Sequence, residues 1–155
     1  AYCTRVGSGP FPSEAFDDEG DKLREIGKEY GSTTGRPRRC GWLDLVALKY
    51  SIMLNGVTQL IMTKTDVLDS FDTIKVATAY NVNGQISDHM PYDLDADVHA
   101  IYTEMPGWKT DLTGIRSKEQ FPQELKDYIM FLEKELKIPV KYISVGPDRE
   151  QIIDL

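Results

Sequence analysis

The amino-acid sequence predicts an α/β protein. Two segments, 42–55 and 121–136, repeat apolar residues at the spacing of a helix. Three short apolar or β-branched runs, near 57–63, 74–82 and 140–145, have the length of buried strands. Helical and strand-like segments alternate along the chain, and 155 residues is the size of a single domain.

The beginning of the chain is expected to hold an irregular segment followed by a helix. Residues 1–16 are expected to be irregular because a glycine and two prolines stand close together. Residues 17–30 predict a short amphipathic helix, since apolar side chains recur on one side of it. These apolar positions are Leu23, Ile26 and Tyr30.

Turn residues separate the next elements. Residues 31–41 are rich in Gly, Pro, Ser and Thr and are expected to form a loop. The helix over 42–55 ends at Asn55-Gly56, a pair typical of a helix C-terminus. The run over 57–62 that follows is mostly apolar, so we expect a buried strand there.

The middle of the chain predicts a hairpin. Residues 73–82 form a strand candidate, and Asn83-Gly84 is a strong signal for a tight turn. Residues 85–87 are then able to pair back on the strand. Residues 88–100 are polar and weakly patterned, and 101–105 predict a short strand.

The longest helix is predicted near the end of the chain. A proline near its first turn suits a helix start, and the helix covers 121–136. A last buried strand is expected over 140–145. The apolar positions of the helix are Leu125, Ile129, Leu132 and Leu136.

The charge balance and the cysteines limit the function classes. There are 18 basic and 25 acidic residues, a net charge of −7, which disfavours non-specific binding to nucleic acid or to an anionic membrane. Cys3 and Cys40 are expected to be free thiols in a reducing, cytoplasmic setting. His89 and His99 lie in the polar stretch and are expected to be exposed.

A basic loop stands out against this acidic average. It carries Arg36, Arg38 and Arg39 among glycine, proline and threonine residues, and it leads toward the predicted helix over 42–55. Guanidinium groups hold carboxylates or phosphates through paired hydrogen bonds, so one interpretation is an anion site. The other is that the arginines are solvated or pair with Asp44 and Glu29.

The segment Thr63-Lys64-Thr65-Asp66 follows a predicted buried strand. Ligands of open α/β sheets bind at the carboxyl ends of strands. A carboxylate there can accept from both the ring N–H and the exocyclic amine of guanine, and the Lys64 stem can lie along the base. The alternative is a plain turn with Asp66 as a helix N-cap.

Five motifs, in order and spacing, resemble adenylosuccinate synthetase. The motifs are residues 4–12, 33–44, 63–69, 105–108 and 143–149, read as TRVGSGPFP, TTGRPRRCGWLD, TKTDVLD, MPGW and ISVGPDR. The similarity runs through nearly the whole chain. It implies a P-loop-NTPase-like nucleotide-binding fold with a mixed sheet, of which residues 1–155 would be the C-terminal part.

The resemblance also implies an activity. That family uses GTP to phosphorylate the 6-oxygen of IMP, and the amine of L-aspartate then displaces the phosphate, with Mg²⁺ required. It works as a cytoplasmic homodimer in AMP (purine) biosynthesis, with no nucleic acid or membrane partner.

The resemblance assigns binding roles residue by residue. Arg36 would also reach IMP, Arg38 would also reach GTP, and Val6 would touch IMP through its backbone. The residues that would bind the aspartate carboxylates are Ser32, Thr33, Thr34, Gly35, Arg36, Pro37 and Arg38. The residues that would bind guanine are Lys64, Thr65, Asp66, Ser144, Val145 and Gly146.

The sequence lacks parts that the family needs. Its glycine-rich phosphate loop, catalytic histidine and Mg²⁺ ligand do not occur in these residues, so we expect neither catalytic nor metal-binding residues in this chain and no ligase activity from it alone. Missing neighbour strands would leave open sheet edges, so we expect the chain to pack on a second chain or to self-associate. The alternative function is a non-catalytic nucleotide- or anion-binding module.

Overall fold

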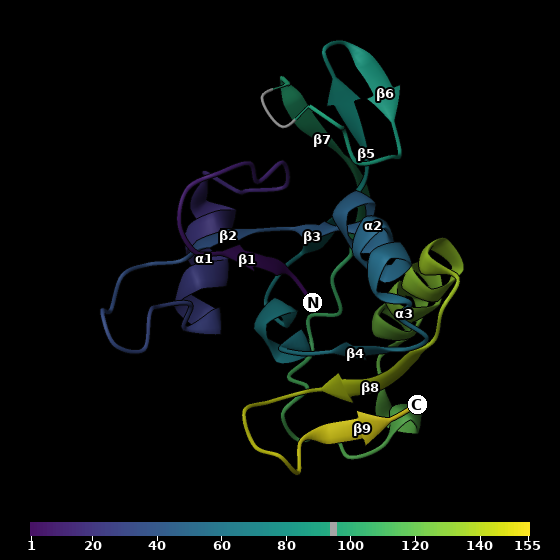
Figure 1. Ribbon diagram of the computed structural model, residues 1–155. Helices are drawn as coiled ribbons and strands as arrows, with labels where there is room; N and C mark the ends of the chain where they lie inside the picture. Colours follow the sequence, from purple (N-terminus) through teal and green to yellow (C-terminus); the bar gives the residue numbers. More distant parts are fainter. Residues whose placement is uncertain (94–95) are drawn as a thin grey trace. The chain divides into compact units, whose positions relative to one another are not determined.

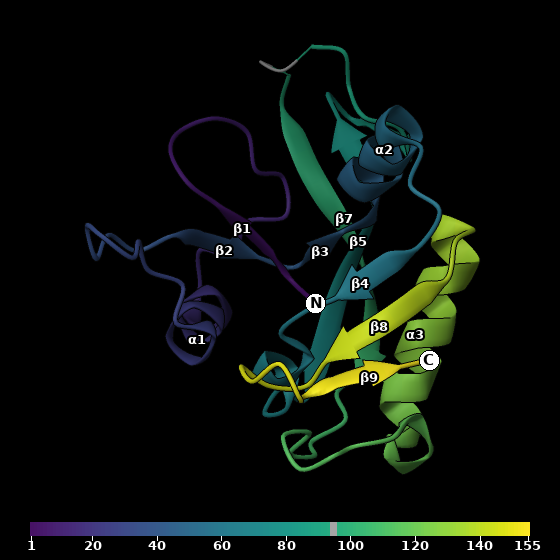
Figure 2. The ribbon, with the colours of Figure 1, turned by 60° about the horizontal axis from the view of Figure 1, so that its bottom comes forward.

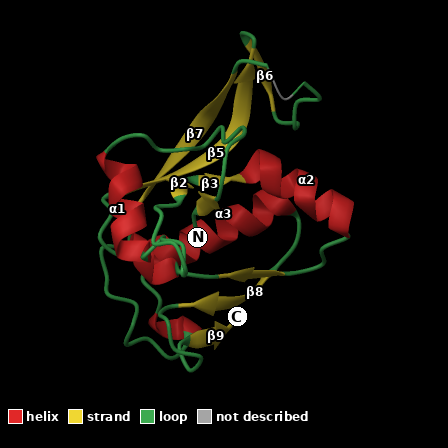
Figure 3. Cartoon of the chain, turned by 60° about the vertical axis from the view of Figure 1, so that its left-hand side comes forward, coloured by secondary structure: helices red, strands yellow, loops and turns green. Residues whose placement is uncertain are grey.

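The computed structural model describes residues 1–93 and 96–155 and contains helices and strands in alternation (Figures 1 and 3). The predicted α/β class is therefore confirmed. The chain divides into two compact units, which are described separately. The first comprises Ala1, 51–74 and 104–155, and the second comprises 2–50 and 75–103. No helix within the described ranges is long and apolar enough to cross a bilayer.

The second unit contains two small sheets and a helix. β1 and β2 pair antiparallel, with Thr4 opposite Cys40. β5 is central in the other sheet, parallel to β3 and antiparallel to β6, and it also pairs with β7. The elements are β1 (Cys3–Arg5), α1 (Asp18–Gly27), β2 (Arg39–Gly41), β3 (Leu43–Asp44), β5 (Thr73–Val82), β6 (Gln85–Ser87) and β7 (Val98–Pro106). Residues 73–74 of β5 and 104–106 of β7 belong to the first unit.

The first unit is a three-stranded sheet with the longest helix. β4 pairs parallel with β8, and β8 pairs antiparallel with β9. Figure 2 shows α3 alongside these strands. The elements are β4 (Leu60–Met62), the 3-10 turns η1 (Thr65–Leu68) and η2 (Lys118–Gln120), α3 (Gln123–Leu136), β8 (Val140–Ser144) and β9 (Ile152–Asp154). α2 (Leu45–Asn55) begins in the second unit and ends in the first.

The elements with the clearest sequence patterns, the β5–β6 hairpin and α3, were predicted correctly. The structure places the hairpin strand at Thr73–Val82 and pairs it through Asn83-Gly84 with Gln85–Ser87, as expected. α3 buries the apolar side chains predicted to face the core, with each at most 7% exposed. These side chains are Leu125, Ile129, Leu132 and Leu136.

The two short strands β1 and β2 were missed. β1 lies in the segment expected to be irregular, and β2 lies at the end of the expected loop over 31–41. Each strand has only three residues and exists because the other lies beside it. Such a long-range pair leaves no local periodicity, so the sequence pattern could not predict it.

The helix predicted over 17–30 differs from the structure in its bounds, since α1 covers Asp18–Gly27, and in its apolar face. α1 begins after Asp17, whose carboxylate accepts from the N–H groups of Glu19 and Gly20. Within it Leu23 is fully buried, but Ile26 is 42% exposed, so the predicted apolar face is narrower than expected.

Three strands also differ from their predictions. β4 is shorter than predicted, and its Ile61 is 62% exposed, so the run is not fully buried. β7 begins at Val98 rather than 101, because residues of the polar stretch pair with β5. β9 was not predicted at all, since its three residues form a strand only by pairing with β8.

Candidate functional site

The parallel pairing of β4 with β8 brings together two segments that lie far apart in the sequence. Met62, the last residue of β4, stands opposite Ile143 near the end of β8. The segments 63–66 and 144–146 therefore leave the sheet at the same edge, at the carboxyl ends of both strands. This edge collects the residues predicted to bind guanine: Lys64, Thr65, Asp66, Ser144, Val145 and Gly146.

The turn after β4 has an unusual backbone. Lys64 adopts a left-handed conformation, with φ of 58°, and leads into the 3-10 turn. Asp66 is the second residue of that turn and no side chain caps it, so the alternative in which Asp66 is a helix N-cap is wrong. Burial raises the pKa of the Asp66 carboxyl, and the charge of Lys64 acts in the opposite direction. Thr65 is fully buried, and no hydrogen-bond partner is described for its hydroxyl.

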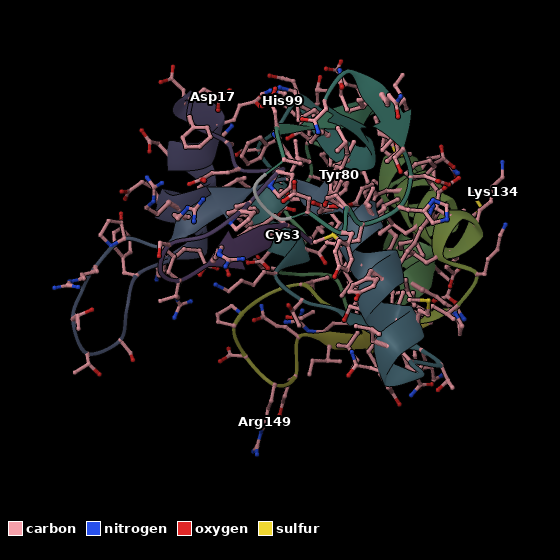
Figure 4. The ribbon with its side chains drawn as sticks, turned by 45° about the horizontal axis from the view of Figure 1, so that its top comes forward. Cys3, Asp17, Tyr80, His99, Lys134 and Arg149 are labelled. Atoms are coloured by element: carbon pink, nitrogen blue, oxygen red, sulfur yellow. The ribbon has the colours of Figure 1, made fainter. Side chains whose placement is uncertain are left out.

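The loop after β8 is held by its own hydrogen bonds. The Ser144 hydroxyl donates to the carbonyl of Gly146 at 2.9 Å. The Val145 N–H donates to the carbonyl of Gln151 at 2.9 Å, so this N–H is not available to a ligand. A Cβ on Gly146 would lie 2.2 Å from Oε1 of Gln151, so it would displace the amide that accepts from the Asp148 N–H and donates to the Thr113 carbonyl. Figure 4 shows Arg149 pointing away from this loop.

Asp69 ties the turn after β4 to a second motif. Its carboxylate accepts from the Trp108 indole N–H and from the Leu112 N–H, both at 2.8 Å. Burial raises the pKa of Asp69 to about 6, against the opposing effect of these two bonds. The segment 105–108 therefore supports the turn that carries Asp66. Sequence reasoning gave Asp69 no such role, because its partners lie far along the chain.

The raised pKa of Asp69 predicts a pH dependence of stability. A folded-state pKa of about 6, above the ordinary 3.8, means that the protonated carboxyl favours the fold. That contribution is full below the unfolded value and is lost as the pH rises through 6. Asp69→Asn, which is uncharged, should gain free energy of unfolding relative to the wild type by on the order of 1 kcal/mol between pH 4 and pH 7, after discounting for solvent screening.

Urea unfolding at several pH values measures this effect. Asp111→Asn is the control with the opposite sign, because hydrogen bonds from Thr113 lower the pKa of the exposed Asp111. Since that pKa lies below the ordinary 3.8, the stability of Asp111→Asn relative to the wild type should fall as the pH rises to about 4 and stay level between pH 4 and pH 7. A difference between the wild type and Asp69→Asn that stays constant with pH would contradict the prediction.

Gly107 in the same support motif predicts a steric effect. A Cβ at Gly107 would lie 1.9 Å from the carbonyl oxygen of Phe71, and the Gly107 N–H donates to the carbonyl of Asp72 at 2.8 Å. Gly107→Ala should therefore lower the free energy of unfolding by about 1–3 kcal/mol. Gly114→Ala is the matched control, since no atom lies within 4 Å of its added Cβ. Equal stability of the two variants, measured by urea unfolding, would refute the close approach.

The basic loop in the second unit is a narrow, exposed turn. The Gly31 N–H donates to the carbonyl of Arg36, and the Gly35 N–H donates to the carbonyl of Gly31, at 2.9 and 2.8 Å. Gly35 has a positive φ of 63°. The exposed residues of the turn are Ser32, Thr33, Thr34, Gly35, Arg36 and Pro37. Hydroxyl and guanidinium donors are thus presented together to solvent.

The three arginines of the loop have different surroundings. Arg36 is exposed and has no ion pair within the described part of the chain. Arg38 forms an ion pair with Glu29 at 2.7 Å, as the alternative interpretation expected. Arg39 donates to both carboxylate oxygens of Glu14. Arg36 is therefore the most accessible cation of the loop, and Arg39 has a structural role.

Two expectations about the surroundings of the loop were wrong. The loop leads into β2 and β3, not directly into a helix, because 39–44 is extended. The helix begins at Leu45, and Asp44 accepts the Ala47 N–H at 3.0 Å. Asp44 does not pair with an arginine, since it is buried and accepts from the Tyr80 hydroxyl at 2.6 Å.

Val6 lies close to the basic loop through the β1–β2 pair. Arg5 stands opposite Arg39, so Val6 follows on one strand where Arg38 precedes on the other. The side chain of Val6 is 80% exposed. Arg39 also donates to the carbonyls of Gly7 and Gly9, at 3.1 and 2.9 Å, and so fixes the segment after Val6. The structure therefore joins the first motif to the arginine loop.

The structure also gives the environments of the cysteines and the histidines. Cys3 and Cys40 are free thiols, as expected. His89 and His99 have side chains 86% and 72% exposed, which confirms that prediction. In residues 1–93 and 96–155, His, Cys, Asp and Glu side chains form no cluster of three able to hold a metal ion.

The comparisons with known proteins point to one family. A family model described as adenylosuccinate synthetase matches residues 1–153. The chain is 60% identical over 154 residues to adenylosuccinate synthetase from Phocaeicola vulgatus, covering 99% of this chain and 36% of that protein. It is 61% identical over 153 residues to adenylosuccinate synthetase from Azobacteroides pseudotrichonymphae, again covering 99% of this chain and 36% of that protein.

A solved structure agrees with these relatives. The structure of fully ligated adenylosuccinate synthetase from Plasmodium falciparum has a TM-score of 0.93 and 38% sequence identity, covering 99% of this chain and 38% of that chain. The chain thus spans 36% of the length of the curated relatives. Since the family model matches almost every residue and the fold agrees, this chain belongs to the adenylosuccinate synthetase family.

Proposed function

We propose that the full-length protein containing this chain is a GTP-dependent ligase that joins IMP and L-aspartate. In this reaction the γ-phosphoryl group of GTP moves to the 6-oxygen of IMP. The amine of aspartate then attacks C6, the carbon that bears this oxygen, and the C6–O bond breaks as phosphate leaves. The products are adenylosuccinate, GDP and phosphate. The observation that carries the proposal is the family match over residues 1–153, together with the two sets of ligand-binding residue types in the chain.

The guanine site is proposed at the edge where β4 and β8 end. The Asp66 carboxylate would accept from the ring N–H and exocyclic amine of guanine, a donor pair that adenine lacks. Lys64 would lie along the base, with Thr65 beside it. Ser144, Val145 and Gly146 would close the pocket with backbone groups. The parallel pairing of Met62 with Ile143 supports this, because it places both segments at one sheet edge.

The aspartate site is proposed on the basic loop. L-aspartate carries two carboxylates, and exposed arginine and threonine donors suit such a ligand. The bound residues would be Ser32, Thr33, Thr34, Gly35, Arg36, Pro37 and Arg38. In this proposal Arg36 also reaches IMP and Arg38 also reaches GTP. The backbone at Val6 contacts IMP, which is consistent with its place beside Arg38 across the β1–β2 pair.

The remaining parts of the machinery are proposed to lie outside this chain. We assign these residues to the C-terminal part of the synthetase, with the phosphate loop, the catalytic histidine and the Mg²⁺ ligands upstream. The bound Mg²⁺ would neutralise phosphate charge during transfer. The full-length protein is proposed to be a cytoplasmic homodimer.

Turnover by the full-length protein tests the function. With IMP, L-aspartate and GTP it should form adenylosuccinate and phosphate in equal amounts, whereas the 155-residue chain alone should form none. The upstream reading frame should encode a glycine-rich phosphate loop and a histidine. Full-length protein without turnover, or a frame that starts at this point, would favour a non-catalytic binding module.

A further inference from the structure

We propose that Glu29 is a positioning residue that holds the Arg38 guanidinium in place for its anionic ligand. The proposal rests on the proposed function, since it concerns the same aspartate loop. Glu29 lies just before that loop and is only 3% exposed. A carboxylate is rarely buried so deeply unless it is paired.

Both oxygens of the Glu29 carboxylate accept a hydrogen bond. The Tyr2 hydroxyl donates to Oε1 at 2.5 Å, and Nη1 of Arg38 donates to Oε2 at 2.7 Å. The backbone adds a further link, because the Arg38 N–H donates to the Glu29 carbonyl at 2.9 Å. The Arg38 residue is thus held by Glu29 at its main chain and at one side of its guanidinium.

The rest of the Arg38 guanidinium remains available. Its side chain is 35% exposed, and its bond to Glu29 uses one N–H donor. No protein partner exists for its other N–H donors among residues 1–93 and 96–155. Arg39 differs, because its donors bind Glu14 and the carbonyls of Gly7 and Gly9. The two neighbouring arginines therefore differ, because four of the five N–H donors of Arg39 bind the protein, whereas Arg38 keeps most of its side-chain donors for a ligand.

Gly27 and Arg24 support the contact between Glu29 and Arg38. A Cβ on Gly27 would lie 2.1 Å from the hydroxyl oxygen of Tyr2, so a glycine is needed for Tyr2 to reach Glu29. Arg24 donates from Nε to the Arg38 carbonyl at 2.9 Å. Its own carbonyl accepts from the Glu29 N–H at 2.9 Å. The ligand therefore meets a guanidinium that is already oriented, which lowers the entropic cost of binding.

The test is a double-mutant cycle in the full-length protein with Glu29→Gln and Arg38→Leu. Glu29→Gln keeps the size of the side chain but removes the charge that orients Arg38. It should raise the KM for aspartate about tenfold and change the KM for IMP less than about twofold. In the Arg38→Leu background, Glu29→Gln should add no further increase, because the residue through which Glu29 acts is gone.

Glu14→Gln is the matched control, since Glu14 pairs with Arg39 in the same way. It should leave the KM for aspartate within about twofold of the wild type, because most donors of Arg39 bind Glu14 and the carbonyls of Gly7 and Gly9 rather than a ligand. Tyr2→Phe, which removes only the hydroxyl bonded to Glu29, should raise the aspartate KM in the same direction by a smaller factor. It serves as the second variant if Glu29→Gln does not fold.

Turnover by the wild type distinguishes a failure of the positioning role of Glu29 from a failure of the proposed function. An active wild type in which Glu29→Gln and Tyr2→Phe leave the aspartate KM unchanged would overturn the positioning role. Additive effects of Glu29→Gln and Arg38→Leu would also overturn it. A wild type without turnover would instead contradict the proposed function.

Discussion

Replacing Asp66 by Asn in the full-length protein should lower kcat/KM for GTP by on the order of a hundredfold or more. The carboxylate of Asp66 accepts hydrogen bonds only, and guanine presents two adjacent N–H donors. An amide places one donor against that pair, which leaves a guanine N–H without an acceptor. The pocket edge carries the half-buried Asp66 beside the fully buried Thr65, so water would not replace the lost bond freely.

The same variant should gain activity with xanthosine triphosphate, because xanthine has an oxygen in place of the exocyclic amine. The measurement is initial rate against nucleotide concentration for GTP, ATP and xanthosine triphosphate. Asp127→Asn on the surface of α3 is the matched control and should keep the wild-type order of preference. If Asp66→Asn keeps its preference for GTP, Asp66 does not read the base.

Arg36→Leu should raise the KM for aspartate about a hundredfold while the fold stays intact. Arg36 is the arginine of the basic loop without an ion pair in the described residues, so its charge is free to meet a carboxylate. Leucine removes the charge and every donor. The melting temperature should not change, because the side chain is exposed and supports no other element.

Steady-state kinetics with aspartate varied at saturating IMP and GTP measures this effect. Lys134→Leu removes an exposed cation from α3, where Figure 4 shows its side chain pointing outward, and should leave the aspartate KM unchanged. An unchanged KM in Arg36→Leu would remove Arg36 from the aspartate site.

The elements that could be predicted from the sequence are those whose own residues determine them. α3 repeats leucine and isoleucine at helical spacing, and the Asn83-Gly84 turn defines the hairpin from β5 to β6. β1, β2 and β9 have three residues each and depend on a partner strand elsewhere in the chain. Their pairing is a long-range property that no local pattern carries.

The candidate site also has parts that the sequence predicts and parts that only the folded chain shows. Motifs 33–44 and 63–69 were recognisable because each is continuous in the sequence. The sequence left open which arginine is available, because that depends on Glu14 and Glu29, and only the folded chain shows where these carboxylates lie. The role of Asp69 depends on its hydrogen bond from Trp108, 39 residues away, so the local sequence around Asp69 could not predict it either.

A crystal structure of the full-length protein with GDP, IMP and an aspartate analogue tests the proposed site most directly. The guanine ring N–H and exocyclic amine should both lie within hydrogen-bond distance of the Asp66 carboxylate, at the edge where β4 and β8 end. The carboxylates of the analogue should meet the guanidinium groups of Arg36 and Arg38. Guanine bound away from Asp66, or an analogue bound away from both arginines, would contradict the assignment.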